Sequence, residues 1–408
     1  MNCCRINADL RSKDMLYRTM KKKIIFVTKA LWIGGIETAL VNLLKHFDYN
    51  KFDVTLLVLK AELDMLDQIN PNCKVIIADR EKKYTFNEEY RYKKLFHLTE
   101  EADNPSKLHK IMMFTVPAIK WIENRLYIKY IRRMMKGQHY DTAVIYSDVV
   151  AETAIRAVDS DKYLMYYHHG AMRHVYHDKI AYKRCEKIIA VSNNQADELR
   201  KYVPSAKDKI ITIHNLTDVE GIREKSFQPI EDVFDSEKYN IVSVGRVSHE
   251  KGMDIAVEVC AKLVAAGHKN IQWWIVGDGP AIDEVKGKIS DLHMEIYVKC
   301  VGMKNNPYPY IRHADLYVQP SRFEGYPMTL LEAQVLGKVI VSTDNNGAKE
   351  IIENNVTGKL CETQMSIFSE IIKLIDDNGE YKRIQNRVAN LDFEKLNWQC
   401  TTHLYEEL

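Results

Sequence analysis

The chain has 408 residues, which is enough for two domains, and its hydrophobic content of 46% supports large buried cores. The formal net charge of +2 gives no overall signal for nucleic-acid binding. The eight cysteines form no Cys-x-x-Cys pair and no run of 18 apolar residues occurs, so we expect neither a zinc site nor a transmembrane helix. Residues 1–19 are polar and charged and do not resemble a secretory signal. They are read as a leader, either a disordered tail or an artefact of start-codon choice.

Short apolar runs alternate with amphipathic segments along the rest of the chain. The first series has candidate strands at 24–28, 54–59, 74–77, 142–146, 163–167, 187–191 and 210–213. The second series has candidate strands at 239–244, 272–276, 296–300, 316–319 and 339–342. Alternation of strands and helices predicts parallel sheets covered on both faces. We therefore expect an α/β protein with two doubly wound domains, at 20–225 and 226–385, and a ligand beyond the carboxyl ends of the strands.

Two glycines, Gly34 and Gly35, follow the first strand and open an amphipathic helix over 36–46. Glycines at a helix start let a ligand approach the backbone closely. The same pair is also typical of an ordinary turn. Gly35 is thus a candidate binding residue.

A pair of histidines, His168 and His169, precedes Gly170 at the end of a candidate strand. Adjacent side chains on an extended chain point to opposite sides, so the pair does not chelate one ion easily. His174 and His177 could offer ligands on a helix, but no cysteine or carboxylate cluster completes a metal site. The only Asp-x-Asp sequence, at 159–161, precedes a strand, and we interpret it as a solvated loop rather than a metal site.

Residues 105–136 combine eight Lys or Arg with one Glu, a local charge of +7, and carry interspersed apolar side chains that include Trp121. This composition suits an anionic membrane surface. The alternative is a helix that packs on its own domain and exposes a basic side. No fold signal supports RNA binding, so we expect no nucleic-acid partner.

The loop from Val244 to Gly252 ends a strand and carries Gly245, Arg246 and Lys251. Arginine supplies a planar fork and lysine a point charge, so two cations on a glycine-bounded loop suit a diphosphate. A surface turn with solvated charges is the alternative.

The most informative stretch runs from Ser321 to Ala333 and places Glu324 and Glu332 eight positions apart. Pro327 suits the first position of a helix, where a missing N–H costs nothing. Unpaired N–H groups at a helix start form an anion site. The groups expected there belong to Met328, Thr329 and Leu330. Two acids beside an anion site suit a ligand with hydroxyls and phosphates.

These motifs, in order from about Lys22 to the C-terminus, resemble retaining glycosyltransferases of the GT-B fold, specifically glycosyltransferase family 4. The resemblance implies two Rossmann-like domains that face a central cleft, the first for the acceptor and the second for the nucleotide sugar. It also implies that the last helix, at 386–408, crosses back onto the first domain. An Asn at position 346 replaces the first glycine of the family's Gly-Gly-x-x-Glu loop, which weakens any role in sugar binding there.

The resemblance also assigns roles to residues. His169, rather than His168, would contact the sugar near the reacting centre, and Glu324 would lie by the donor sugar. Arg246 and Lys251 would contact the leaving group, while Glu332 would accept hydrogen bonds from ribose hydroxyls. Because cations and a helix start fill the role of a metal, we expect no metal or other cofactor.

The implied function is transfer of a sugar, as a hexosyltransferase, from a nucleotide-sugar donor to a saccharide or lipid-linked acceptor in cell-surface polysaccharide biosynthesis. The expected location is the cytoplasm, either free or peripheral on the inner face of the plasma membrane through residues 105–136. Two alternatives remain: a sugar-nucleotide epimerase of the same fold, and a non-catalytic subunit that binds a sugar nucleotide.

Overall fold

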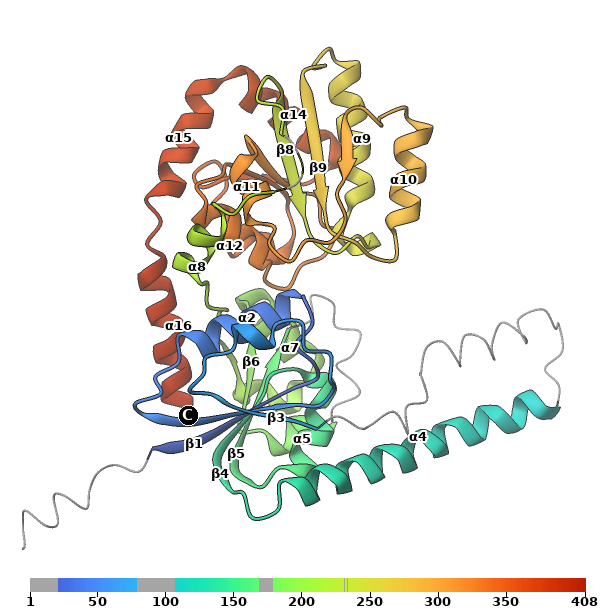
Figure 1. The fold of residues 1–408 in the computed structure, drawn as a ribbon, viewed down its shortest axis with the longest axis vertical. Helices are drawn as coiled ribbons and strands as arrows, with labels where there is room; N and C mark the ends of the chain where they lie inside the picture. Colours follow the sequence, from blue (N-terminus) through green and yellow to red (C-terminus); the bar gives the residue numbers. More distant parts are fainter. Residues whose placement is uncertain (1–20, 79–106, 169–178, 231, 233) are drawn as a thin grey trace, which may run out of the picture. The chain divides into compact units, whose positions relative to one another are not determined.

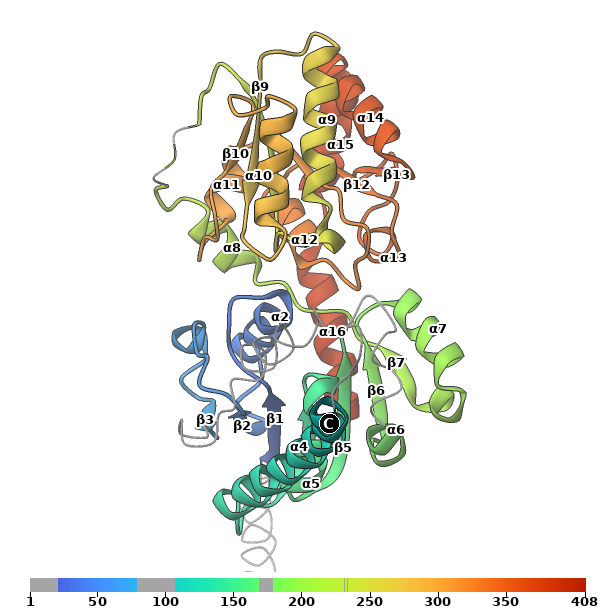
Figure 2. The same ribbon diagram turned by 90° about the vertical axis from the view of Figure 1, so that its right-hand side faces the viewer.

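A computed structural model describes residues 21–78, 107–168, 179–230, 232 and 234–408, and within 107–120 it describes the backbone alone (Figures 1 and 2). The expected leader at 1–19 lies outside the described residues. Two parallel sheets carry the fold, as expected. None of the helices in the described part of the chain has the length and hydrophobicity that a membrane crossing needs.

The first sheet has seven strands in the order β3-β2-β1-β4-β5-β6-β7. β1 pairs in parallel with β2 and β4, with Ile24 opposite Val54 and Thr142, and β4 pairs in parallel with β5. All seven expected strands are present, with ends that differ by a few residues at most. Their bounds are Lys22–Thr28 (β1), Phe52–Val58 (β2), Lys74–Ile77 (β3), Tyr140–Ile145 (β4), Ser160–Tyr167 (β5), Lys187–Ala190 (β6) and Ile210–Thr212 (β7).

The second sheet has six strands in the order β10-β9-β8-β11-β12-β13. Five of them match the expected strands, and the sixth, β13, was missed because its three residues, Lys-Leu-Cys, form no apolar run. The bounds are Tyr239–Val244 (β8), Ile271–Val276 (β9), Val298–Cys300 (β10), Leu316–Gln319 (β11), Ile340–Thr343 (β12) and Lys359–Cys361 (β13).

Both sheets have the same winding. Numbered within its own sheet, the second follows the order 3-2-1-4-5-6, which is that of a doubly wound dinucleotide-binding fold, and the first follows the same order with a seventh strand added. In the second sheet the order reverses between β8 and β11, which pair in parallel with Tyr317 opposite Val242. Ligands of such sheets bind outside the carboxyl ends of the strands at this point. The loops after β8 and β11 are therefore where a site is expected.

Helices connect the strands. In the first half of the chain they are α2 (Gly35–Lys45), α4 (Lys107–Met134), α5 (Ala151–Ala157), α6 (Lys179–Arg184), α7 (Asn193–Tyr202) and α8 (Val219–Lys225). In the second half they are α9 (Met253–Ala265), α10 (Ile282–Asp291), α11 (Tyr308–His313), α12 (Met328–Val335), α13 (Asn346–Lys349), α14 (Gln364–Asp376), α15 (Asn378–Ala389) and α16 (Phe393–Glu407). A short 3-10 turn, η5 (His249–Lys251), follows β8.

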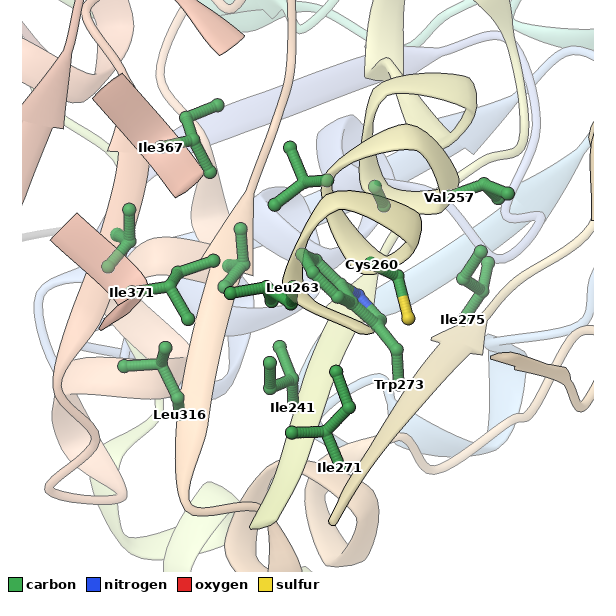
Figure 3. Packing of buried hydrophobic residues seen from close by; sticks show 14 of the residues in the cluster. Ile241, Val257, Cys260, Leu263, Ile271, Trp273, Ile275, Leu316, Ile367 and Ile371 are labelled. Atoms are coloured by element: carbon green, nitrogen blue, oxygen red, sulfur yellow. The ribbon is translucent and has the colours of Figure 1, made fainter. Parts of the chain in front are cut away.

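The second sheet buries a separate core on each face because successive strand residues point to opposite sides. Trp273 and Ile241 belong to the core under α9, α10, α14 and α15, which Figure 3 shows in part. Trp274 and Val242 belong to the core under α11, α12 and α13. Both buried indole N–H groups have an acceptor within the sheet, at 3.0 Å each.

The described residues fall into two compact units, which do not follow the two sheets. The first comprises residues within Met1–Trp32, Leu44–Met165 and Lys183–Glu186, and the second those within Ile33–Leu43, Tyr166–Tyr182 and Lys187–Leu408. In the second unit, Lys187 at the start of β6 pairs with Glu407 of α16 at 3.6 Å. The last helix thus reaches a strand of the first sheet.

Candidate functional site

The loops after β8, β9 and β11 pack so closely that they require glycine. A Cβ on Gly277 would lie 1.9 Å from the carbonyl oxygen of Gly245, and Gly277 has a φ of +145°. A Cβ on Gly252, which has a φ of +66°, would lie 2.1 Å from the carbonyl oxygen of Pro320. These contacts hold the loop that carries Lys251 against the end of β11.

Lys251 and Glu324 meet where the winding of the second sheet reverses. The Lys251 Nζ donates to Glu324 Oε1 at 2.7 Å and to Oε2 at 2.8 Å. The Glu324 side chain is 7% exposed, whereas that of Lys251 is 25% exposed. Because the pair is only partly shielded from solvent, an arriving anion could reach the ammonium.

Gln319, the last residue of β11, also contacts Glu324. Its Nε2 donates to Glu324 Oε1 at 2.8 Å. Gln319 was not predicted from the sequence. The sequence does contain a signal for it, because Gln319 is a polar residue at the end of an otherwise apolar strand, immediately before the glutamate motif.

Arg246 lies on the same loop after β8 as Lys251, but its ion pair is with Glu250 and not with Glu324. Its side chain is 66% exposed, and its guanidinium lies 3.6 Å from the Glu250 carboxylate. An exposed ion pair of this kind contributes little to stability. The Arg246 side chain therefore remains available to a ligand at small cost.

Arg322, within the glutamate motif, fastens the two loops together. Its backbone N–H donates to the carbonyl of Glu250 at 2.7 Å, and its guanidinium donates to both Asp254 oxygens at 2.8 and 2.7 Å. Burial, the largest single effect, acts to raise the pKa of Asp254. The Arg322 hydrogen bonds and charge together with the Lys288 charge outweigh it, so the pKa lies below its usual value. This bidentate pair was not predicted from the sequence.

The start of α12 differs from the prediction in two respects. Pro327 is not the first helical residue: its ψ of 102° is extended, so it caps the helix that begins at Met328. The N–H of Leu330 is not free, because it donates to the Pro327 carbonyl at 3.1 Å in a tight first turn. The Leu330 N–H is therefore already engaged within the first turn, and its role in ligand binding stays a prediction. Within the described residues, the N–H groups of Met328 and Thr329 have no hydrogen-bond acceptor.

Glu332 lies on α12 and is 6% exposed. The Tyr308 hydroxyl donates to its Oε1 at 3.4 Å. Removal from water raises the pKa of Glu332 to about 7, against smaller opposing effects of Tyr308 and the Lys225 charge. Its protonation is therefore sensitive to any ligand that donates hydrogen bonds to it.

The other candidates lie elsewhere or outside the described residues. Gly35 is the first residue of α2, and a Cβ there would meet no described atom within 4 Å. His169 lies outside the described residues, as do His174 and His177. Asp159 and Asp161 lie at the start of β5, the end opposite the carboxyl edge, and both contact His139.

The loop in which Asn346 replaces a glycine opens α13, and its acid, Glu350, is engaged within the second unit. Glu350 Oε1 accepts hydrogen bonds from the backbone N–H of Asn194 at 2.9 Å and from its side-chain amide at 3.0 Å. His214 lies 3.4 Å from Glu350 Oε2. These contacts occupy the carboxylate with protein donors. The functional roles of all the candidate residues remain predictions.

Two family models match consecutive parts of the chain. Residues 33–220 match the model for glycosyltransferase family 4, and residues 224–390 match the model for glycosyl transferases group 1. The first match ends and the second begins within α8.

One curated relative is an enzyme of Campylobacter jejuni, which is 26% identical over 51% of this chain and 56% of its own length. It is named N-acetylgalactosamine-N,N'-diacetylbacillosaminyl-diphospho-undecaprenol 4-alpha-N-acetylgalactosaminyltransferase. An uncharacterized glycosyltransferase of Methanocaldococcus jannaschii is 24% identical over 53% of this chain. The match spans 63% of that relative, so the chain spans little more than half the length of these curated relatives.

Solved structures show the same fold. Anabaena HepE in complex with UDP and glucose superposes with a TM-score of 0.68, at 16% identity, over 94% of this chain and all of HepE. A glycosyltransferase from Rickettsia africae has a TM-score of 0.66 at 18% identity, over 95% of this chain and 98% of its own. Together with the consecutive family matches, this GT-B architecture shows that the chain belongs to the group 1 glycosyltransferases, of the family 4 type.

Proposed function

We propose that this protein is a retaining glycosyltransferase that moves a sugar from a nucleotide-sugar donor to a saccharide or lipid-linked acceptor in cell-surface polysaccharide biosynthesis. One observation carries the proposal: Lys251 and Glu324 are hydrogen-bonded to each other at the reversal point of the second sheet. An ammonium and a carboxylate side by side suit a ligand that carries both a diphosphate and sugar hydroxyls. The family to which the chain belongs supports the same reaction class.

The donor diphosphate would draw Lys251 away from Glu324. Lys251, the exposed Arg246 and the N–H groups of Met328 and Thr329 would then bind its oxygens. These groups are fixed before the reaction, so they would stabilise the negative charge that develops as the diphosphate departs. Because the protein supplies this positive charge, we propose that turnover needs no divalent ion.

The transfer step would occur on one face of the sugar. The bond from the anomeric carbon to the diphosphate oxygen breaks while the acceptor oxygen bonds to that carbon from the same side. A departing diphosphate oxygen takes the acceptor proton, so the anomeric configuration is retained. Glu324 would hold sugar hydroxyls and stabilise the cationic centre by its charge, and Glu332 would accept hydrogen bonds from the ribose.

The class of donor and acceptor is supported by the names of related proteins. The Campylobacter jejuni relative is named for a diphospho-undecaprenol acceptor, and HepE was solved with UDP and glucose. We therefore propose a screen that begins with uridine-based sugars and includes polyprenyl diphosphate saccharides as acceptors.

The screen measures thermal stability with each nucleotide sugar. A donor at 100 times its dissociation constant stabilises the folded state by about 2.7 kcal/mol. The donor selected is then incubated with acceptors, and the product's anomeric proton coupling is read by NMR. An α-linked product from an α-linked donor is expected. A β product would contradict retention, donor conversion without an acceptor would indicate an epimerase, and stabilisation without turnover would indicate a non-catalytic subunit.

We further propose that α4 docks the protein on the inner, cytoplasmic face of the plasma membrane. One side of the described part of α4 packs on its own unit, where Ile128, Ile131 and Met135 are buried. The opposite side exposes large apolar side chains at 43–53% of their surface, those of Ile122, Leu126 and Tyr130. Trp121, two turns before Ile128 and on nearly the same side of the helix, is 60% exposed.

Cations alternate with these exposed side chains. Arg125, Lys129 and Arg133 are exposed at spacings of four residues, and the Arg125 guanidinium lies 4.5 Å from the centre of the Trp121 ring. Residues four apart share one helix face. An exposed face with both apolar and basic groups is typical of helices that lie in a membrane interface.

Vesicle co-sedimentation tests this proposal. Each cation near an anionic surface contributes about 1 kcal/mol, roughly fivefold in partitioning. Changing Lys129 and Arg133 to Glu should release the protein from anionic vesicles, while the matched change of Lys51 and Lys74, exposed elsewhere in the same unit, should not. Binding should weaken with salt. Binding that ignores lipid charge, or that survives in the first variant, would leave α4 as ordinary surface.

A further inference from the structure

Gln319 is a buried amide whose polar atoms are all engaged. It is 1% exposed. Its Nε2 donates to Glu324 Oε1 at 2.8 Å and to Ser321 Oγ at 2.9 Å. Its Oε1 accepts hydrogen bonds from the Tyr317 hydroxyl at 2.8 Å and from Thr329 Oγ1 at 3.3 Å.

The chemistry of these neighbours fixes the orientation of the amide. An ionised carboxylate can only accept hydrogen bonds, so the side of Gln319 that faces Glu324 must be the NH₂ group. The oxygen then faces two hydroxyls, both of which can donate. A reversed amide would place an oxygen against the carboxylate and lose these bonds. Gln319 therefore presents a fixed donor to Glu324.

The two donors on Glu324 differ in mobility. Lys251 has a long flexible side chain, 25% of which is exposed, and its ammonium can move to an anionic ligand. Gln319 is buried and held from its other side by Tyr317 and Thr329. When Lys251 leaves, the hydrogen bond from Gln319 to the Glu324 carboxylate remains.

We propose that Gln319 is a positioning residue. It holds the Glu324 carboxylate in its orientation while Lys251 is drawn to the donor diphosphate. This inference rests on the proposed function, because it assumes that the diphosphate binds Lys251. It explains why a polar residue occupies the end of an otherwise apolar, fully buried strand.

The test replaces Gln319 with Met, an unbranched side chain of similar size without hydrogen-bonding groups. A hydrogen bond to a charged group lost in this way should lower kcat 10- to 100-fold, with the KM for the donor within threefold of wild type. Tyr317→Phe removes one of the two donors to the amide oxygen and leaves Thr329, so it should give a smaller fall in kcat of the same kind.

The control is Gln272→Met, which alters a buried amide on β9, a strand that β8 separates from β11. This amide bonds to the Tyr297 carbonyl and not to Glu324. The kcat of the control should match wild type. A structural role alone would lower the thermal stability of both Gln variants and would change kcat equally in both. An unchanged kcat in Gln319→Met would overturn the proposal.

A second readout does not depend on activity. The ¹³C signal of the Glu324 carboxyl, identified by its loss in Glu324→Gln, should have a different chemical shift in Gln319→Met and in wild type, because the carboxylate has lost a hydrogen-bond donor. The difference should grow when a nucleoside diphosphate is added, because Lys251 then turns to the diphosphate. If no nucleotide sugar binds wild type, the proposed function fails, and the chemical shift without nucleotide still decides whether Gln319 positions Glu324. An identical chemical shift in both proteins refutes the positioning role.

Discussion

The buried carboxyl of Glu332 makes the stability of the protein depend on pH. Its pKa is raised from 4.5 to about 7, chiefly because burial disfavours the charged form. A raised pKa means that the folded state binds the proton more tightly than the unfolded state. The contribution of Glu332 is therefore fully present below about pH 4.5 and is lost as the pH rises through 7.

The magnitude follows from the shift. Each pKa unit corresponds to about 1.4 kcal/mol, so the shift from 4.5 to about 7 corresponds to about 3 kcal/mol of unfolding free energy. Glu332→Gln keeps the shape and the Tyr308 contact but cannot ionise. Relative to wild type, the variant should gain up to about 3 kcal/mol between pH 4.5 and pH 7.5.

Urea unfolding at pH 4.5, 6.0 and 7.5 measures this difference. Trp273 and Trp274 are both buried in the sheet that packs against α12, so their fluorescence reports on the relevant core. Glu362→Gln, at an exposed position, is the control and should show no such trend. A difference between wild type and Glu332→Gln that stays constant across this pH range would refute the reasoning.

Three further outcomes are expected. Lys251→Ala should lower turnover roughly 10²-fold or more, the scale of losing one charge-stabilising donor; turnover within twofold of wild type, measured by nucleotide release, would remove Lys251 from the site. Activity should survive excess EDTA, and complete loss restored by Mg²⁺ or Mn²⁺ would contradict a reaction without metal. Gly277→Ala should lower the midpoint of thermal unfolding, since the added Cβ would lie 1.9 Å from the Gly245 carbonyl oxygen at a φ of +145°; an unchanged midpoint would show that the loops shift to make room.

Some features of the site were accessible from sequence only in part. The motif indicated that Glu324, Glu332 and a helix start lie close together, because they are neighbours along the chain. It did not indicate which N–H groups stay free, since the tight first turn engages Leu330. The sequence patterns also did not reveal α8 beside the expected domain boundary at 225, because that helix has only seven residues.

The sequence by itself determined where the strands lie along the chain and that they form two sheets. Apolar runs and helical patterns depend on residues close together in the chain, so they can be read without the structure. β13 escaped this reasoning because it carries a buried lysine, Lys359, whose charge is paired with Glu370 and Glu380 from later helices. The contact of Lys251 with Glu324 joins residues 73 positions apart, and the clamp of Arg322 on Asp254 joins residues 68 apart. Only the folded sheet, which brings the ends of β8 and β11 together, decides those pairings.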